Sequence, residues 1–347
     1  RAPGGGQSSR SDGETMPALP TTVVLHAPAD PIPHASGHRS GTAGDRLGAV
    51  PAGRLADRPG WRRRRGSRRW LVGATLLLAA LQLAAPRVEA QGNPHPLVLV
   101  HGFTGWGPGE MGGYNYWGGW DDIAASLTAA GHETHVAVVG PLSSNWDRAC
   151  ELYAYIAGGR VDYGRAHSER FGHNRYGRTF PGLLPDWGTT DARASLHLVG
   201  HSQGGQSVRV LTSLLARGDA AEIAAAAAAE EPVHPLFAGG KANLVRSITT
   251  LVSPHDGTTL ANLLDGGSDY LLSWLLTLTS HLNRLEPEAP PYDFKLDQWD
   301  ISRKPGEEDE DYRRRLSESG VWRQPDISVF DLKPEGAMAL NQRYPAV

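Results

Sequence analysis

The most constraining feature of the sequence is the pentapeptide Gly200–Gly204, which reads Gly-His-Ser-Gln-Gly and fits the pattern G-x-S-x-G. It follows the apolar run Leu196–Gly200 and precedes a helical pattern that extends to Leu215. In this context the glycines allow a sharp turn from a buried strand into a helix, and the turn holds a serine hydroxyl above the sheet. The pattern therefore predicts an exposed nucleophile at Ser202, and a tight turn without chemistry is the alternative.

Other stretches alternate between apolar strands and helices, which is typical of an α/β fold with a parallel sheet. The run Pro96–Val100 ends in His-Gly and predicts a strand buried on both faces. Further expected elements are a helix at Asp121–Ala130, strands at His135–Val139 and Ser247–Val252, and an alanine-rich surface helix at Ala220–Ala229. Between the second and third strands, residues 141–193 form a polar, Tyr- and Gly-rich insertion. We expect an irregular loop there, which either has a function or is held together by a cross-link such as a bound metal.

Two backbone N–H groups are expected to stabilise an oxyanion beside the serine. One belongs to Gln203, which directly follows Ser202 at the start of the helix. The other belongs to Phe103, in the loop after the first strand. These positions indicate acyl-transfer chemistry.

A serine hydroxyl also needs a base, commonly a histidine oriented by a carboxylate. The histidines that follow the serine are His234, His255 and His281. His255 lies in a Ser-Pro-His-Asp-Gly turn after the fourth strand, and His281 ends a leucine-rich helical stretch. Neither position matches a triad histidine, so the sequence does not identify the base.

The insertion also carries possible metal ligands, namely Asp147, His167 and His173. The two histidines are six residues apart, a spacing that does not place them on one helical face, yet an irregular loop could bring them together. Two imidazoles and two carboxylates would make a closed, neutral, tetrahedral zinc site, with the fourth ligand from elsewhere. Scattered surface residues are the alternative. The single cysteine, Cys150, excludes a disulfide framework within the chain and a cysteine-based zinc ribbon.

The N-terminal residues differ from the rest. Residues 1–60 are rich in Gly, Pro, Ser and Ala, and we expect them to be disordered or to precede the native start. Residues 61–90 combine an Arg-rich segment, an apolar run and a small-x-small site, which predicts a secretory signal peptide cleaved near Ala90. The alternative is an uncleaved anchor, although the apolar run is shorter than the roughly 20 residues of a membrane span. The formal net charge of −3 includes this basic leader, so the remainder is acidic, which argues against a nucleic-acid partner.

Several longer strings resemble one known family. They are Val98–Gly107, Tyr116–Gly119, Gly140–Glu151, Val161–Gly164, Gly177–Pro185, His201–Gly205, Pro254–Thr259 and Tyr292–Trp299. Together they resemble the thermoalkalophilic lipases of thermophilic bacilli, to which the staphylococcal lipases are related. The likeness covers nearly all of residues 97–342.

The resemblance implies an α/β-hydrolase fold over residues 91–347, with a zinc-braced insertion at about 141–193 and a helical lid at about 263–285. A core helix is the alternative for the lid. It also implies a secreted protein that hydrolyses long-chain acylglycerols at a lipid–water interface. The implied nucleophile is Ser202, with Phe103 and Gln203 as oxyanion donors. The implied structural Zn²⁺ ligands are Asp147, His167, His173 and Asp326.

The sequence departs from the family in one respect. The family's catalytic Asp and His, and its Ca²⁺ ligands, lie in a C-terminal third that this sequence does not match, so we expect Ca²⁺ only in a longer protein. Because triad residues act as a unit, turnover by the 347-residue chain should be strongly reduced. Two alternatives remain: an inactive lipase-like remnant or binding protein, and an esterase or phospholipase with the same machinery.

Overall fold

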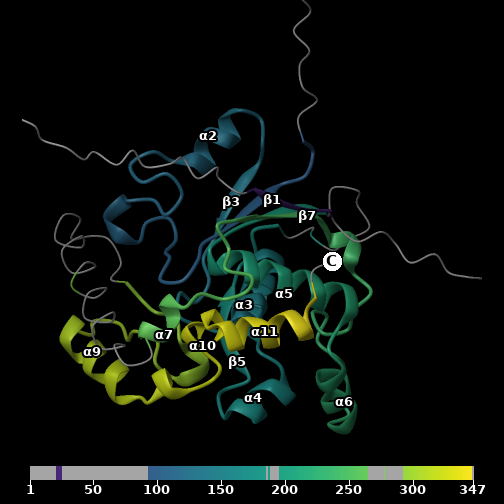
Figure 1. Ribbon diagram of the computed structural model, residues 1–347, viewed down its shortest axis with the longest axis vertical. Helices are drawn as coiled ribbons and strands as arrows, with labels where there is room; N and C mark the ends of the chain where they lie inside the picture. The colour runs from purple at the N-terminus through teal and green to yellow at the C-terminus, as the bar shows by residue number, and fades with distance from the viewer. Residues whose placement is uncertain are drawn as a thin grey trace, which may run out of the picture. The chain divides into compact units, whose positions relative to one another are not determined.

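A computed structural model of the chain describes residues 21–25, 93–184, 187, 195–264, 277 and 292–345. Within these residues five strands form a sheet in the order β1-β7-β6-β2-β3, in which every neighbouring pair is parallel (Figure 1). The strands are β1 Thr21–Leu25, β2 Leu97–Val100, β3 Thr134–Ala137, β6 Leu196–His201 and β7 Val245–Leu251. The expected α/β fold with a parallel sheet is therefore confirmed.

Helices α3 (Asn145–Ala157) and α5 (Gln203–Arg217) pack against each other, and α5 also packs on strands β6 and β7. Strands β4 (Gly159–Asp162) and β5 (Tyr176–Phe180) form a separate antiparallel pair. The other helices are α2 Ile123–Ala129, α4 Arg165–Phe171, α6 Ala220–Ala228, α7 Leu260–Leu264, α9 Asp309–Glu318, α10 Ser328–Leu332 and α11 Pro334–Arg343. Short 3-10 turns occupy Met111–Gly113, Ala242–Leu244, Asp297–Trp299 and Val321–Arg323.

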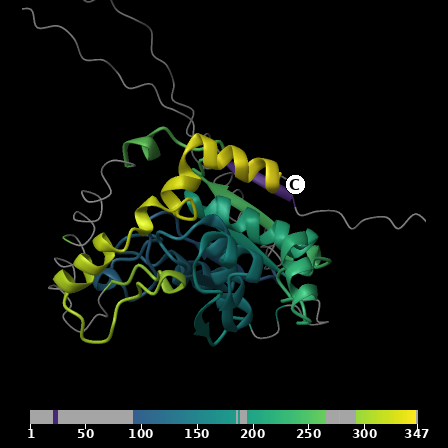
Figure 2. The same cartoon turned by 90° about the horizontal axis from the view of Figure 1, so that it is seen from below.

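The main core lies between the sheet and the α3–α5 layer. It joins apolar strand residues such as Val98 and Leu198 to residues of α5 such as Leu211, all of them fully buried. Helix α11, yellow in Figure 2, is tied to α5 by the Arg209 guanidinium, which donates to Asn341 Oδ1 at 2.6 Å. A second cluster, which includes Tyr292, packs beside the loop that follows β2. These two clusters hold the ends of β2 and β6 in place, where the candidate functional residues lie.

The expected elements agree with β2, β3, β6, β7, α2, α5 and α6 to within a few residues. The expectation of an irregular loop at 141–193 is wrong, since the described part of this insertion contains α3, β4, α4 and β5. Helix α3 forms because Ser144 Oγ caps it by accepting from the Asp147 N–H, and because most of its residues are buried, among them Trp146 and Leu152. Several polar residues of α3 are also buried, so the sequence lacks the alternation of apolar and polar faces that marks a helix.

Strand β1 lies within residues 1–60, where the sequence analysis expected no regular structure. It pairs with the edge of β7, from Thr21 opposite Ser247 to Leu25 opposite Leu251. The segment reads Thr-Thr-Val-Val-Leu, and such β-branched residues favour a strand wherever a sheet edge offers unpaired backbone groups. These five residues therefore form a strand, and the other residues of the range 1–60 lie outside the described part.

The predicted signal peptide at 61–90 lies outside the described residues, as does His281. The predicted lid at 263–285 also lies outside them, except for Leu263, Leu264 and Thr277. Among the helices of the described part, none is long and apolar enough to cross a membrane.

Candidate active site and metal site

Ser202 occupies the sharp turn between β6 and α5. Its φ of 55° and ψ of −128° lie in a left-handed region that a residue with a side chain rarely adopts. Two backbone hydrogen bonds hold the turn: Ser202 N–H donates to Leu251 O at 2.9 Å, and Gly205 N–H donates to Ser202 O at 3.1 Å. The expected strand–turn–helix context is present, and the role of Ser202 as a nucleophile stays a prediction.

The sheet register brings the loop after β2 to the serine. Val100 pairs with Gly200, so both strands end at the same level, and Gly102 approaches so closely that an added Cβ would lie 2.6 Å from Ser202 Cβ. Phe103 follows in this loop and packs against the second core cluster. Gln203 is the first residue of α5, where backbone N–H groups have no partner within the helix. Both expected oxyanion donors thus belong to segments that flank Ser202.

Tyr116 links these two segments, a role that the sequence reasoning missed. Its Oη accepts a hydrogen bond from Gly102 N–H at 2.9 Å and donates one to His201 Nδ1 at 2.5 Å. Burial raises the pKa of the Tyr116 phenol and lowers the pKa of His201, which favours the neutral acceptor form of the imidazole. The signal was available, since Tyr116 begins one of the strings that resemble the lipase family.

A buried arginine also stabilises the loop after β2. Arg148 on α3 donates from Nε to Ser207 Oγ at 2.8 Å, from Nη1 to Gly140 O at 2.7 Å, and from Nη2 to His101 O. Burial, together with the nearby Arg148 charge, lowers the pKa of His101 well below its usual value. Neutral His101 can then donate from Nδ1 to Gly102 O at 2.9 Å. This network holds the backbone of His101 and Gly102, next to the expected oxyanion donor Phe103.

Glu151 binds the segment after β3, whose Gly140 also contacts Arg148. Its carboxylate accepts from Gly140 N–H, from the Tyr163 hydroxyl at 3.0 Å and from Ser143 Oγ at 3.3 Å. Burial is the main effect on its pKa, which rises from 4.5 to about 7. The buried carboxyl group of Glu151 therefore titrates near neutral pH.

This titration predicts how stability depends on pH. Because the folded-state pKa is the higher one, the folded protein keeps a proton on Glu151 that the unfolded chain releases between pH 4.5 and about 7, so stability falls as pH rises through this window. The parent should lose stability on going from pH 5 to pH 8, and we expect Glu151→Gln to reduce this loss of unfolding free energy by on the order of 2 kcal/mol. Urea unfolding of both proteins at pH 5 and pH 8 measures it. Equal losses in both proteins would show that another group is responsible.

His255, one of the histidines considered as a base, has other partners. His255 Nδ1 lies 3.3 Å from Arg209 Nη1, and its Nε2 lies 3.2 Å from Thr250 Oγ1, so both ring nitrogens are engaged elsewhere. Among the described residues, no hydrogen bond joins Ser202 Oγ to a histidine. The described residues therefore contain Ser202 at its turn and the two segments that are expected to carry the oxyanion donors, without a histidine hydrogen-bonded to Ser202 Oγ.

The four expected metal ligands converge in one buried cluster. Each of Asp147, His167, His173 and Asp326 offers a ligand atom, and these atoms all lie within 4.8 Å of one another. His167 Nε2 is 3.3 Å from Asp147 Oδ1 and 3.0 Å from Asp326 Oδ2. His173 Nε2 is 3.2 Å from the same Asp326 oxygen. Asp326, which the sequence could assign only by resemblance, lies between the two histidines.

The chemistry of this cluster fits a cation. Asp147 Oδ1 and His173 Nε2 are buried and lack a hydrogen-bond partner. His173 donates from Nδ1 to Asn174 O at 2.9 Å, which leaves the Nε2 lone pair for a metal. Gln298 Nε2 orients Asp147 by donating to its Oδ2 at 2.7 Å. Burial and the neighbouring Asp326 raise the pKa of Asp147, and a bound cation would relieve both effects.

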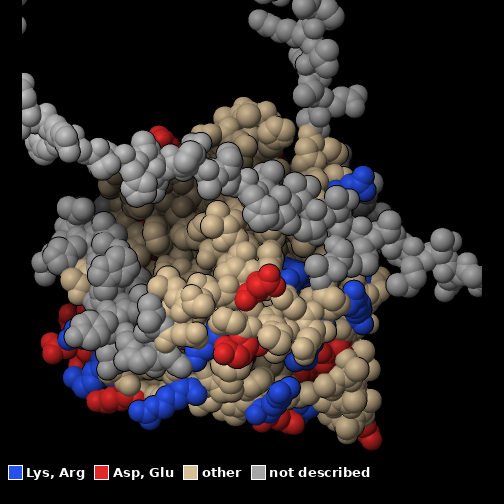
Figure 3. Space-filling model, viewed as in Figure 1, with Lys and Arg blue, Asp and Glu red and all other residues tan. Residues whose placement is uncertain are grey.

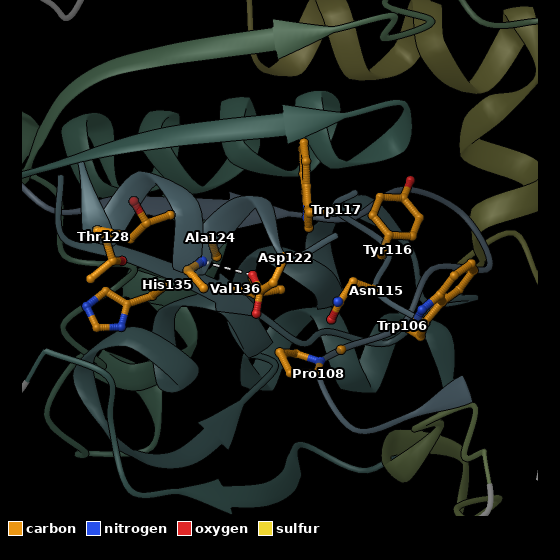
Figure 4. A pocket seen from close by; sticks show the side chains of 14 residues that line it. Trp106, Pro108, Asn115, Tyr116, Trp117, Asp122, Ala124, Thr128, His135 and Val136 are labelled. Atoms are coloured by element: carbon orange, nitrogen blue, oxygen red, sulfur yellow. Dashed lines mark hydrogen bonds between the residues drawn. The ribbon is translucent and has the colours of Figure 1, made fainter. Parts of the chain in front are cut away.

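An open pocket of about 590 Å³ lies beside the active-site loop (Figure 4). Trp106, Tyr116 and Trp117 line one end of it, and Thr128 and His135 line the other. This volume is in the range of small-molecule sites. Because Tyr116 both lines the pocket and bonds Gly102 N–H, the pocket adjoins the candidate active site.

Comparison with known proteins identifies the family. Residues 93–345 match the family described as "Lipase-like, C-terminal domain". The "Lipase" of Staphylococcus hyicus is 42% identical over 266 residues, which cover 75% of this chain and 40% of that protein. The chain thus spans less than half the length of this relative.

Solved structures agree. EstA from Clostridium botulinum is 47% identical with a TM-score of 0.66, over 74% of this chain and 58% of that one. Lipase 1 from Pelosinus fermentans is 48% identical with a TM-score of 0.65, over 74% of this chain and 66% of that one. The resemblance to bacterial lipases is confirmed, and through residues 93–345 the chain belongs to the family of lipase-like C-terminal domains.

Proposed function

We propose that this chain carries the nucleophile-bearing part of a secreted serine carboxylic-ester hydrolase that acts on long-chain acylglycerols at a lipid–water interface. The observation that carries the proposal is Ser202 at a strained strand–helix turn, beside two segments that offer backbone N–H groups. The names of the relatives support an activity on esters of lipids.

In the proposed reaction Ser202 Oγ attacks the ester carbonyl carbon while a base takes the hydroxyl proton. The N–H groups of Phe103 and Gln203 stabilise the oxyanion that forms. The ester C–O bond then breaks, the alcohol leaves with a proton, and water later releases the acid from the acyl-enzyme. We propose that the base is a histidine, oriented by an aspartate, outside the described residues.

We further propose that the cluster of Asp147, His167, His173 and Asp326 holds Zn²⁺ in a structural role. Four protein ligands complete a tetrahedral shell and leave no open position for substrate. When bound, the ion supplies a fixed positive charge that joins α3, α4 and the segment before α10. The Ca²⁺ expected in a longer protein stays part of this proposal, without ligands among the described residues.

A serine-reactive fluorophosphonate tests the nucleophile, because labelling forms one P–O bond with the serine and expels fluoride. We expect Ser202→Ala to abolish labelling, and the surface variant Ser126→Ala to leave it unchanged. The parent chain should turn over long-chain esters several orders of magnitude more slowly than a complete triad enzyme.

Other outcomes favour the alternatives. A folded parent chain that is not labelled would favour a lipase-like binding protein. Equal labelling of the parent and Ser202→Ala would show that another residue reacts. Hydrolysis confined to short soluble esters would favour an esterase, and hydrolysis of phospholipid esters would favour a phospholipase.

A further inference from the structure

Large apolar side chains are exposed near α2, on the outer side of the active-site loop. The exposed fractions are 75% for Trp120, 37% for Tyr114 and 41% for Ile123. We call these three residues the aromatic patch. Trp120 is the most exposed of the exposed aromatic side chains in the described part, and such a residue commonly marks an interaction site.

The aromatic patch is built on a fixed turn. Asn115 N–H donates to Gly119 O at 2.8 Å, and Gly119 N–H donates back to Asn115 O at 3.0 Å. Gly118 and Gly119 adopt positive φ values of 114° and 71°, which close the turn. The Trp120 ring meets Tyr114 edge to face at 5.2 Å. The exposed indole is therefore presented by a hydrogen-bonded turn.

A row of rings connects the aromatic patch to the nucleophile. Tyr114 lies 6.3 Å from Trp106, and Trp106 lies 5.2 Å from Tyr116, measured between ring centroids. Tyr116 in turn lies 5.6 Å from His201, the residue before Ser202. A surface that met Trp120 would therefore lie at the outer end of an apolar path toward the candidate active site.

Charge restricts what this surface can bind. No Lys or Arg occurs between His101 and Asp147, whereas the exposed Asp121 and Asp122 lie close to the aromatic patch in sequence. On the face drawn in Figure 3, charged side chains gather over the lower part, and the surface at the top, where α2 lies, is mostly uncharged. Carboxylates repel an anionic membrane, and in a dimer they would face their own copies. Indole and phenol rings favour the boundary between apolar and polar phases.

We propose that the aromatic patch docks this domain on an uncharged lipid surface and places the loop that carries Phe103 toward it. The inference deepens the proposed function by assigning the lipid contact to Trp120, Tyr114 and Ile123. It does not depend on turnover, and so it can fail separately from the assignment of Ser202.

Flotation with triolein droplets coated in phosphatidylcholine tests the proposal, with the full chain carrying Ser202→Ala so that no lipid is consumed. Transfer of most of an indole surface from water predicts that Trp120→Ala weakens partitioning about tenfold or more. Ile123→Ser, at a second position of the aromatic patch, should weaken it less. Met338→Ala is the matched control, since Met338 is 58% exposed on α11, and it should partition like the parent. Melting curves establish that each variant is folded.

Three results would overturn the proposal. Flotation of a folded Trp120→Ala chain equal to that of the parent would exclude the aromatic patch as the contact. Failure of the parent to float at all would mean that the surface has another partner. Binding that grows stronger when phosphatidylglycerol replaces phosphatidylcholine would contradict the charge argument. None of these results bears on labelling of Ser202.

Discussion

Removal of a bound metal ion should lower the thermal midpoint of this domain by about 10 °C. A ligand that binds only the folded state at about 1,000 times its Kd contributes about 4 kcal/mol, and for a domain of this size each kcal/mol moves the midpoint by about 2–4 °C. The effect should be large because Asp147, His167 and Asp326 are buried and come from segments far apart in the sequence. Thermal unfolding with and without a chelator measures it, and elemental analysis of the loaded protein identifies the ion.

Two variants make the measurement specific. Asp147→Asn should melt lower and lose its response to the chelator, because it removes one ligand charge while keeping nearly the same shape. Asp121→Asn changes an exposed carboxylate outside the cluster and should respond as the parent does. If the chelator leaves the parent's melting curve unchanged, the cluster does not hold a metal, and its two histidines balance the carboxylates by their own protons.

The sharp turn at Ser202 could be predicted from sequence because its determinants are local. The sequence signals are a buried strand, two glycines and the beginning of a helix, all within a few residues of Ser202. The structure has the same strand and helix on either side of Ser202. The strands could be predicted for the same reason, since continuous apolar runs mark strands that are buried on both faces. The strained φ of Ser202 follows from the same turn.

The bracing residues could not be predicted, because their partners are distant in sequence. Arg148 looks like a surface charge on a polar segment, yet it donates to the backbone of His101 and Gly140 from a fully buried position. Tyr116 contacts His201 across 85 positions. The partners of such a side chain are known only once the strand order is known.

The metal cluster is intermediate between these cases. Asp147, His167 and His173 stood out as potential ligands, but their spacing matched no helix face. The fold solves this by placing Asp147 in the first turn of α3, His167 within α4, and His173 just after the left-handed Gly172 that ends α4. Asp326 was assigned from family resemblance alone, and it joins the cluster from the segment before α10.

The second large effect is expected at Gly204, where helix propensity and packing predict opposite signs. Gly204 has no positive φ and lies in the first turn of α5, and alanine in a helix is ordinarily about 1 kcal/mol more stable than glycine. An added Cβ, however, would lie 2.3 Å from Val100 O and 2.7 Å from His101 O. These are backbone atoms of the strand end that carries the oxyanion loop, and they cannot move without shifting that loop. We therefore expect Gly204→Ala to destabilise the domain by about 3 kcal/mol.

Urea unfolding measures the change in the free energy of unfolding. The rate of fluorophosphonate labelling reports whether the turn at Ser202 keeps its geometry. Labelling of the folded variant should slow because the strand end moves away from Ser202. Gly131→Ala is the control, since Gly131 has a φ of 93° and no atom within 4 Å of an added Cβ. It should cost only the backbone strain of about 1–2 kcal/mol and leave labelling unchanged. A Gly204→Ala chain that is more stable than the parent would mean that β2 and α5 do not make this close contact, and the proposed oxyanion site would then lose its support.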